Sequence, residues 1–197
     1  MVDCTAPGGR ARSARACPAA GGPTTTQPPP GKEAGWTDVA MLHLMVGLPC
    51  SGKTTWARQL ETRHNALRLT PDEWHIRLFG HDFGEDVGAS DQMRHDIRHE
   101  AVEAVMWDVA SRALVLGVDV ILDFGCWVRS QRDEFRSKAA AIGADFVIHF
   151  SDASQQELLE RLRIRNAQLS ETTFYIPERK LREWMRLFEP PSRDEMV

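Results

Sequence analysis

One segment of the sequence combines two glycines, a lysine and a threonine at a spacing suited to holding phosphate groups. Residues 47–54 read Gly-Leu-Pro-Cys-Ser-Gly-Lys-Thr and match G-x-x-x-x-G-K-[ST] at every fixed position. Gly47 and Gly52 permit the backbone angles and the close approach that let successive N–H groups surround a phosphate. Lys53 can reach the outer phosphates of ATP, and the Thr54 hydroxyl can bind Mg²⁺. We expect nucleotide contacts from Gly47, Leu48, Pro49, Cys50, Ser51, Gly52, Lys53, Thr54 and Thr55.

Two carboxylates follow apolar segments that have the composition of buried strands. Asp123 comes directly after residues 118–122, and Asp72 comes shortly after residues 66–69. Ligands of open parallel sheets bind where the strands end. Asp123 can therefore hold Mg²⁺, and Asp72 can orient an acceptor hydroxyl and take its proton. Each carboxylate also has a simpler structural explanation. Asp123 could cap a turn, and Asp72 could stabilise a helix by its interaction with the positive end of the helix dipole.

Arginines later in the chain can neutralise the charge of a transferred phosphoryl group. Arg161 and Arg165 lie one turn apart on a predicted helix that could close over the nucleotide, although a solvated helix face would have the same spacing. Arg129 and Arg132 lie beyond the predicted strand at 118–122 and could contact acceptor or phosphate. We assign catalytic roles to Lys53, Asp72, Arg129, Arg161 and Arg165, and metal-binding roles to Thr54 and Asp123.

Short apolar segments alternate with amphipathic ones, which is the pattern of βαβ units. Thr70, Ser130 and Ser154 are placed to cap three of the helices. The sequence therefore predicts an α/β three-layer sandwich with a parallel sheet of four to five strands, helices on both faces and a small helical lid. Strands are expected at 41–46, 66–69, 118–122 and 145–150, and helices at 53–64, from 71 to about 80, 91–116, 131–142, 155–165 and 178–188.

Composition separates the first 37 of the 197 residues from the rest. Residues 1–37 contain six glycines and six prolines, carry a net charge of +2, and have almost no large apolar side chains, which predicts a disordered tail or a start assigned upstream of Met41. The total net charge of −4 leaves −6 for the expected domain at 38–197. An acidic domain argues against a nucleic-acid coat protein, and no apolar stretch is long enough for a membrane span.

The cysteines and histidines do not have the spacing of a zinc site. Without a secretory signal, we expect four reduced thiols in a cytoplasmic protein. His95 and His99 lie four residues apart, but the glutamate and third ligand of a zinc enzyme are absent from their pattern, so no metal is expected there. The cysteines are Cys4, Cys17, Cys50 and Cys126.

With these residues placed, the chain resembles the branch of P-loop kinases that includes zeta toxins, polynucleotide 5′-kinases and small antibiotic kinases, often labelled AAA-family ATPases. The resemblance spans about residues 41–166 and rests on GLPCSGKTT, Asp72, the VILD strand with a following arginine, and ERLRIRN. It implies the P-loop NTPase fold, with nucleotide and metal bound by Lys53 and Thr54. It also implies that Asp72 is the base and that Arg161 and Arg165 contact phosphate.

These observations predict an ATP- and Mg²⁺-dependent phosphotransferase whose partners are a nucleotide and a hydroxyl-bearing small molecule, such as an antibiotic or a metabolite. Three alternatives stay open: a polynucleotide 5′-hydroxyl kinase, a zeta-like kinase of nucleotide sugars acting as a toxin, and an ATP-binding regulator with slow hydrolysis. The charge of −6 disfavours a nucleic-acid partner. The choice of acceptor depends on the loops at 81–90 and 167–176, and GTP stays open as the donor.

Overall fold

The computed structural model describes residues 39–84 and 88–196, so the tail predicted at 1–37 lies outside the described residues. The elements follow one another in βα order, as the sequence pattern predicts. They are β1 (Met41–Val46), α1 (Lys53–His64), β2 (Leu67–Leu69), α2 (Pro71–Phe79), α3 (Ala89–Val115), β3 (Val120–Gly125), α4 (Arg129–Ala141), β4 (Asp145–Phe150), α5 (Gln155–Ala167), α6 (Glu178–Leu187) and the 3₁₀ turn η1 (Arg193–Glu195).

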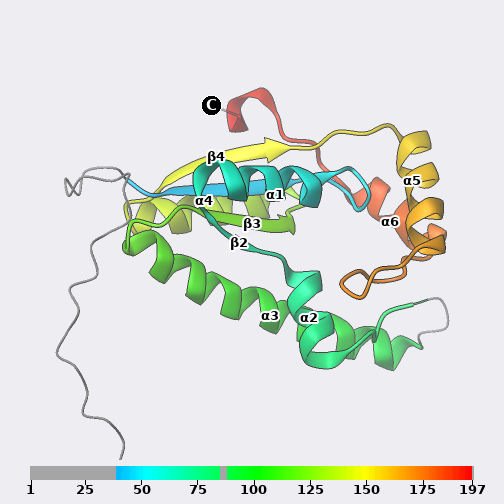
Figure 1. The fold of residues 1–197 in the computed structure, drawn as a ribbon. Helices are drawn as coiled ribbons and strands as arrows, with labels where there is room; N and C mark the ends of the chain where they lie inside the picture. The colour runs from blue at the N-terminus through cyan, green and yellow to red at the C-terminus, as the bar shows by residue number, and fades with distance from the viewer. Residues whose placement is uncertain (1–38, 85–87, 197) are drawn as a thin grey trace, which may run out of the picture. The chain divides into compact units, whose positions relative to one another are not determined.

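The four strands form one parallel sheet in the order β2-β3-β1-β4. Leu42 in the central strand β1 lies opposite Val120 of β3 on one side and Phe146 of β4 on the other. Because all four strands run in the same direction, their carboxyl ends meet at one edge of the sheet, where Figure 1 shows the loops that lead to the remaining helices.

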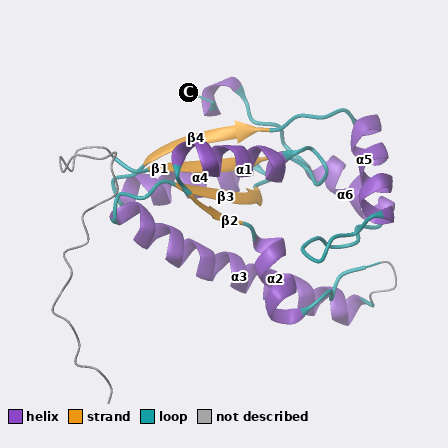
Figure 2. Ribbon diagram, viewed as in Figure 1, coloured by secondary structure: helices purple, strands orange, loops and turns teal. Residues whose placement is uncertain are grey.

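Helices cover both faces of the sheet, as predicted (Figure 2). On one face, α1 packs against Met45 and Ile121 through Ala57 and Leu60. On the other face, α3 and α4 cover a larger core that includes the alternate residues of β1. This alternation of inward side chains is what a strand buried on both faces requires. The three-layer α/β prediction is confirmed, with four strands in the sheet.

A separate apolar cluster holds α5 and α6 beyond the carboxyl ends of the strands, where the two helices lie together in Figure 1. Leu158 and Leu162 of α5 pack with Leu181 of α6, and Leu48 from the loop after β1 joins them. α5 corresponds to the predicted lid helix, and the small core that it shares with α6 ties both helices to that loop. The other buried members are Phe83, Phe174 and Ile176.

Helix starts and strand ends differ from the prediction where tertiary contacts compete with local capping. Ser154 caps α5 as expected, with its hydroxyl accepting from the Glu157 N–H at 3.3 Å. α4 begins at Arg129 with Val128 as its N-cap, so Ser130 is not a cap. Thr70 is the N-cap of α2 by position, but its side chain makes no capping bond. β3 runs on to Gly125 instead of ending before Asp123.

The C-terminal segment returns to α4 and is fixed by a buried ion pair. The Arg132 guanidinium donates to both carboxylate oxygens of Glu195, at 2.7 and 3.1 Å, and both side chains are 1% exposed. Arg132 also donates to the Glu189 carbonyl at 3.0 Å. The suggestion that Arg132 contacts acceptor or phosphate is therefore wrong, because its donors are occupied by the chain's own terminus. Within the described residues, no helix has both the length and the hydropathy of a membrane span.

Candidate active site

The loop between β1 and α1, which we call the phosphate loop (residues 47–54), depends on its two glycines. Gly47 has φ +147°, and a Cβ there would lie 2.6 Å from the Ser151 carbonyl oxygen and 2.8 Å from Ser51 Oγ. Gly52 has φ +105° and precedes the first residue of α1. The Gly47 N–H donates to the Gly125 carbonyl at 3.0 Å, which ties the loop to the end of β3. Only glycine fits such a close backbone approach.

The N-terminus of α1 carries no cap of its own. Its N-cap, Gly52, offers no side-chain acceptor, and the first turn contains no acidic residue. The first N–H groups of a helix have no partner inside it, and the helix dipole makes this end positive. Ser51 Oγ, at the same turn, is buried without a partner among the described residues. The loop therefore presents unpaired donors suited to an anion.

Lys53 and Asp123 carry opposite charges into this site without being paired to each other. Lys53 Nζ donates to the Leu48 carbonyl at 2.8 Å. Burial lowers the pKa of Lys53, and the negative charges of Asp123 and Asp72 oppose that shift. Burial raises the pKa of the Asp123 carboxyl, and the charge of Lys53 opposes the rise. A phosphate reaching Lys53 would thus meet a cation whose carbonyl contact it can replace.

The oxygen atoms beside Lys53 fit Mg²⁺. Asp123 Oδ2 accepts from the Thr70 hydroxyl at 3.5 Å, whereas Oδ1 is buried and has no partner among the described residues. Thr54, in the first turn of α1, lines the same cleft as Asp123. A carboxylate oxygen and a hydroxyl are hard ligands of the kind Mg²⁺ takes, together with phosphate oxygens and water. The Thr70 hydroxyl accepts from the Arg68 guanidinium instead of from an N–H of α2, so that side chain does not cap the helix.

The two arginines predicted on the lid both come to the phosphate loop. Arg161 Nη1 donates to the carbonyls of Cys50 and Ser51, at 3.4 and 3.3 Å. Arg165 lies against Cys50 Sγ at 4.0 Å and donates to the Phe174 carbonyl at 3.2 Å. Its Nε is buried without a partner among the described residues. Arg161 also pairs with the exposed Glu157 at 3.3 Å, whereas these contacts of Arg165 are with neutral groups, so an anion at the loop could be met by both side chains.

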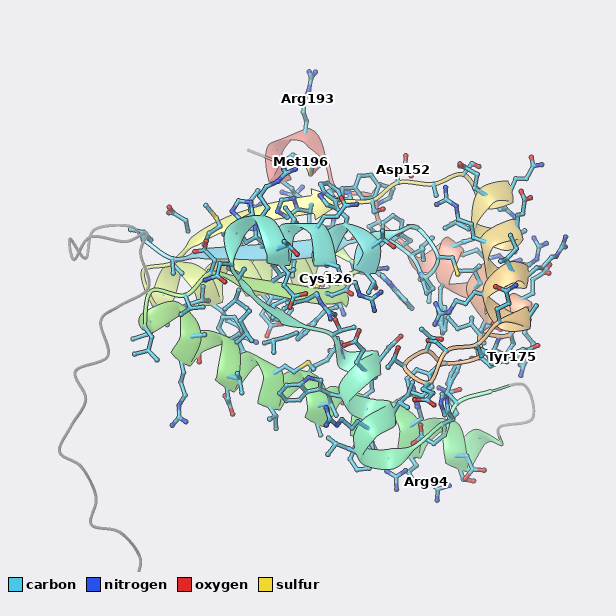
Figure 3. All side chains as sticks on the ribbon, in the orientation of Figure 1. Arg94, Cys126, Asp152, Tyr175, Arg193 and Met196 are labelled. Carbon is cyan, nitrogen blue, oxygen red and sulfur yellow. The ribbon has the colours of Figure 1, made fainter. Side chains whose placement is uncertain are left out.

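Arg129 lies apart from this group. Its guanidinium forms an ion pair with Asp194 at 2.7 Å and donates to Ser192 Oγ at 3.2 Å, so it joins α4 to the C-terminal turn. It is not among the residues that line the cleft. Figure 3 labels Arg193 and Met196 in this C-terminal turn, and Cys126 directly after β3.

A single cleft of about 1130 Å³ joins the phosphate loop to the start of α2 and one side of α3. This volume exceeds the roughly 300–1,000 Å³ of a pocket for one small ligand. Asp72 lines the cleft, and no hydrogen bond or ion pair within the described part of the chain engages its carboxylate. The side chains that line the α3 side are His95, Asp96, His99, Glu100 and Glu103.

The α3 side of the cleft is acidic. Burial, together with the charges of Asp72 and Glu100, raises the pKa of Glu103 to about 7. Trp127, after β3, also lines the cleft and packs on Trp184 of α6 with ring centroids 5.1 Å apart. Apart from Asp123, the charged side chains that line the cleft are thus basic at the loop and lid and acidic along α3.

Two residues at the site have no functional assignment from the sequence, although both directly follow strands, as the rule applied to Asp123 requires. Ser151 directly follows β4, and its hydroxyl donates to the Ser51 carbonyl at 2.8 Å, which buttresses the phosphate loop. Thr70 directly follows β2 and reaches Asp123. Because Thr70 matches a helix-capping pattern, the sequence did not indicate its hydrogen bond to Asp123. A residue that follows a strand and precedes a helix can serve either purpose.

Replacing Gly47 with alanine is expected to weaken ATP binding at least about tenfold and to cost about 1–3 kcal/mol of stability. The added Cβ cannot occupy its place 2.6 Å from the Ser151 oxygen, so the loop must shift away from β4. Nucleotide titration and thermal unfolding measure the two effects. Gly143→Ala is the control, because Gly143 also has positive φ but has open space around it. Equal ATP affinity in the Gly47 and Gly143 variants would contradict the role given to Gly47.

The fold and this loop define a protein with the P-loop α/β fold. The AAA domain model AAA_33 matches residues 42–191, and the chain belongs to that family. A comparison with curated proteins finds no match.

Several solved structures share this fold. A putative kinase from Chloroflexus aurantiacus has a TM-score of 0.57 at 20% identity, over 67% of this chain and 70% of that chain. Kti12 of Chaetomium thermophilum, in complex with ADP-AlF3, has a TM-score of 0.56 at 20% identity, over 77% and 81%. A chain of the Pnkp1/Rnl/Hen1 RNA repair complex has a TM-score of 0.55 at 24% identity, over 76% and 44%. At these identities the likeness establishes the fold.

Proposed function

We propose that this chain transfers the terminal phosphoryl group of ATP to a hydroxyl of a small molecule. The observation that carries the proposal is the position of Asp72, an unpaired carboxylate that lines the same cleft as the uncapped phosphate loop. Nucleotide binding alone needs no free carboxylate at this position in the cleft. A transfer reaction does need one, to orient the attacking hydroxyl and accept its proton.

Phosphate binding in this proposal comes from the loop amides, Lys53 and the two lid arginines. The unpaired N–H groups at the start of α1 surround a phosphate, and Lys53 exchanges its carbonyl contact for an outer phosphate oxygen. Arg161 and Arg165 stabilise the charge that spreads over the transferred group. Thr54 and Asp123 would hold Mg²⁺, which neutralises phosphate charge when bound. Arg129 takes no part, because its partners lie at the C-terminal turn.

The charge of the cleft favours a neutral or cationic acceptor. Glu100 and Asp96 line the α3 side together with Asp72, and Glu103 adds a partly ionised carboxyl near neutral pH. A polynucleotide or a nucleotide sugar would bring phosphates to this surface, and like charges repel. We therefore favour a polyol or an amine-bearing alcohol over the polynucleotide and zeta-like alternatives. The cytoplasm, where ATP is abundant, is the compartment we propose.

The experiment is a thermal-shift screen of neutral, cationic and anionic hydroxyl compounds in the presence of Mg²⁺ and a non-hydrolysable ATP analogue. A ligand that binds the folded state raises the melting temperature by mass action. We expect the analogue to stabilise the chain and neutral or cationic alcohols to add a further shift. Stabilisation by the analogue with no further shift from any alcohol would favour the regulatory alternative. A shift confined to 5′-hydroxyl oligonucleotides would favour the polynucleotide kinase.

Replacing Arg161 with alanine is expected to lower the rate of transfer about 10²–10³-fold, because one donor to the reacting group is lost. Steady-state kinetics with a saturating acceptor measures the change. Arg163→Ala is the matched control, since Arg163 lies on the same helix, is 71% exposed and pairs only with Glu178 among the ion pairs of the described residues. A comparable loss in both variants would indicate a general effect of charge on α5 instead of contact with the phosphoryl group.

A further inference from the structure

Three histidines come together between α2 and α3, away from the nucleotide end of the cleft. His75 of α2 is fully buried, His95 of α3 is 8% exposed, and His99 lies one turn further along α3. One ligand nitrogen from each ring lies within 4.8 Å of the other two. The sequence supplied the pair on α3 but not the third ring, because His75 is brought to them only by the packing of α2 on α3.

Hydrogen bonds from two of the rings to one carboxylate fix which nitrogens carry protons. Asp82 Oδ1 lies 2.8 Å from His75 Nε2 and 2.7 Å from His95 Nδ1, and Arg98 donates to Asp82 Oδ2 at 3.0 Å. An ionised carboxylate only accepts, so both of these ring nitrogens must donate. The opposite nitrogens, His75 Nδ1 and His95 Nε2, then bear lone pairs in the neutral rings.

The third ring completes the same pattern. His99 Nε2 lies 3.6 Å from Glu103 Oε1, so an ionised Glu103 favours the proton on that side and the lone pair on Nδ1. His75 Nδ1 and His99 Nδ1 are both buried without a hydrogen-bond partner among the described residues. A buried acceptor without a donor is costly. Neighbouring nitrogen lone pairs without hydrogen-bond donors are suited to coordinate a metal ion, which accepts their electron pairs.

The separations of the rings suit a tetrahedral ion. With metal–nitrogen bonds of about 2.0–2.1 Å, three imidazole rings around such an ion have centroids roughly 5 Å apart. The three observed centroid separations are 4.5, 5.5 and 5.7 Å. Small rotations of the rings would bring the nitrogen–nitrogen distances to those of a tetrahedral site. Asp82 would act as the carboxylate that orients metal-bound histidines through their second nitrogen.

We propose that His75, His95 and His99 form a binding site for a divalent transition-metal ion of the zinc class. Neutral imidazole suits Zn²⁺ and other first-row ions and does not suit Mg²⁺, which prefers oxygen. The ion of this site is therefore distinct from the Mg²⁺ expected beside Asp123. It would link α3 to α2, the helix that begins next to Asp72.

A second histidine group provides the control. His43, His64 and Asp119 also lie within ligand distance of one another, at the other end of β1 and α1. There, His43 Nε2 is also buried without a partner among the described residues, but Asp119 accepts from the Met41 N–H at 2.9 Å and His64 is exposed. This group therefore offers one unpartnered buried nitrogen, against two in the group of His75, His95 and His99, so we assign the ion to the latter.

The test is titration of the chelator-treated full-length chain with Zn²⁺, and with Co²⁺ as a spectroscopic probe, with no nucleotide present. We expect one site per chain and a Co²⁺ visible spectrum of tetrahedral type. His99→Ala should weaken binding by more than the about 10–100-fold typical of losing an orienting partner, and Asp82→Asn by about that factor. His64→Ala should bind like the wild type. Circular dichroism of each apo variant checks that it folds.

Three results would overturn the proposal. The wild-type chain could bind neither ion. His99→Ala, folded, could bind as tightly as the wild type. His64→Ala could abolish binding while His99→Ala keeps it, which would place the ion at the other group. Because the readout is metal binding without ATP, these outcomes are independent of whether the chain is a phosphotransferase.

Discussion

Replacing Asp72 with asparagine is expected to lower acceptor phosphorylation about 10²–10⁴-fold while ATP affinity stays within about twofold of wild type. The Asp72 carboxylate lines the cleft without a hydrogen bond or ion pair among the described residues, so an amide of the same shape changes little in the fold. It cannot accept the proton of an attacking hydroxyl. Single-turnover kinetics and equilibrium ATP titration separate the two quantities.

Two comparison variants make the Asp72 experiment specific. Lys53→Met should weaken ATP binding as well as transfer, because the cation that meets the phosphates is removed. Glu73→Gln is the control for the helix dipole, since Glu73 is the other acid in the first turn of α2 and pairs with Arg68 at 3.2 Å. If Asp72 served only the dipole, both acid variants would lose about 0.3–1 kcal/mol of stability and keep full activity.

Replacing Arg132 with alanine is expected to destabilise the fold by about 3–5 kcal/mol, because it leaves the Glu195 carboxylate buried without its counter-charge. Arg132 holds that carboxylate by two bonds and the Glu189 carbonyl by a third. Few single replacements in a domain have a larger effect. Urea unfolding of the two chains measures the difference in free energy.

Two further experiments test the same ion pair: replacing both of its members, and lowering the pH. The double variant Arg132→Met, Glu195→Leu should be markedly more stable than Arg132→Ala, since no unpaired charge is buried. The Arg132 hydrogen bonds hold the pKa of Glu195 at about 2, below its ordinary value of 4.5. The unfolded chain therefore binds the proton first, and the contribution of Glu195 is complete above pH 4.5 and is lost as pH falls toward 2. A single and a double variant of equal stability would contradict the account.

The parts of this molecule that sequence could predict are those fixed by local pattern. The eight residues of the phosphate loop carry their own geometry, because Gly47 and Gly52 permit only a few turns, and the alternation of apolar segments places a strand before them and a helix after them. The lid arginines followed from helical spacing alone. Both reach the loop because the apolar side of α5 packs on Leu48.

The parts that sequence could not predict depend on contacts between distant residues. Arg129 and Arg132 are spaced as active-site residues would be, but a C-terminal segment more than fifty residues away carries the acids that bind them. His75 resembles an ordinary member of an amphipathic helix until α2 packs on α3. Thr70 satisfies a capping pattern but turns to Asp123, which lies on a neighbouring strand. No local spacing encodes these choices.

The central claim is that the cleft transfers phosphate to a small hydroxyl acceptor, and mass spectrometry of the reaction products tests it most directly. The full-length chain is incubated with ATP, Mg²⁺ and each alcohol that stabilises it. We predict that one neutral or cationic alcohol gains a single phosphoryl group, that ADP forms in equal amount, and that Asp72→Asn stops both. ADP formation that no acceptor accelerates, with free phosphate as the only product, would contradict the claim.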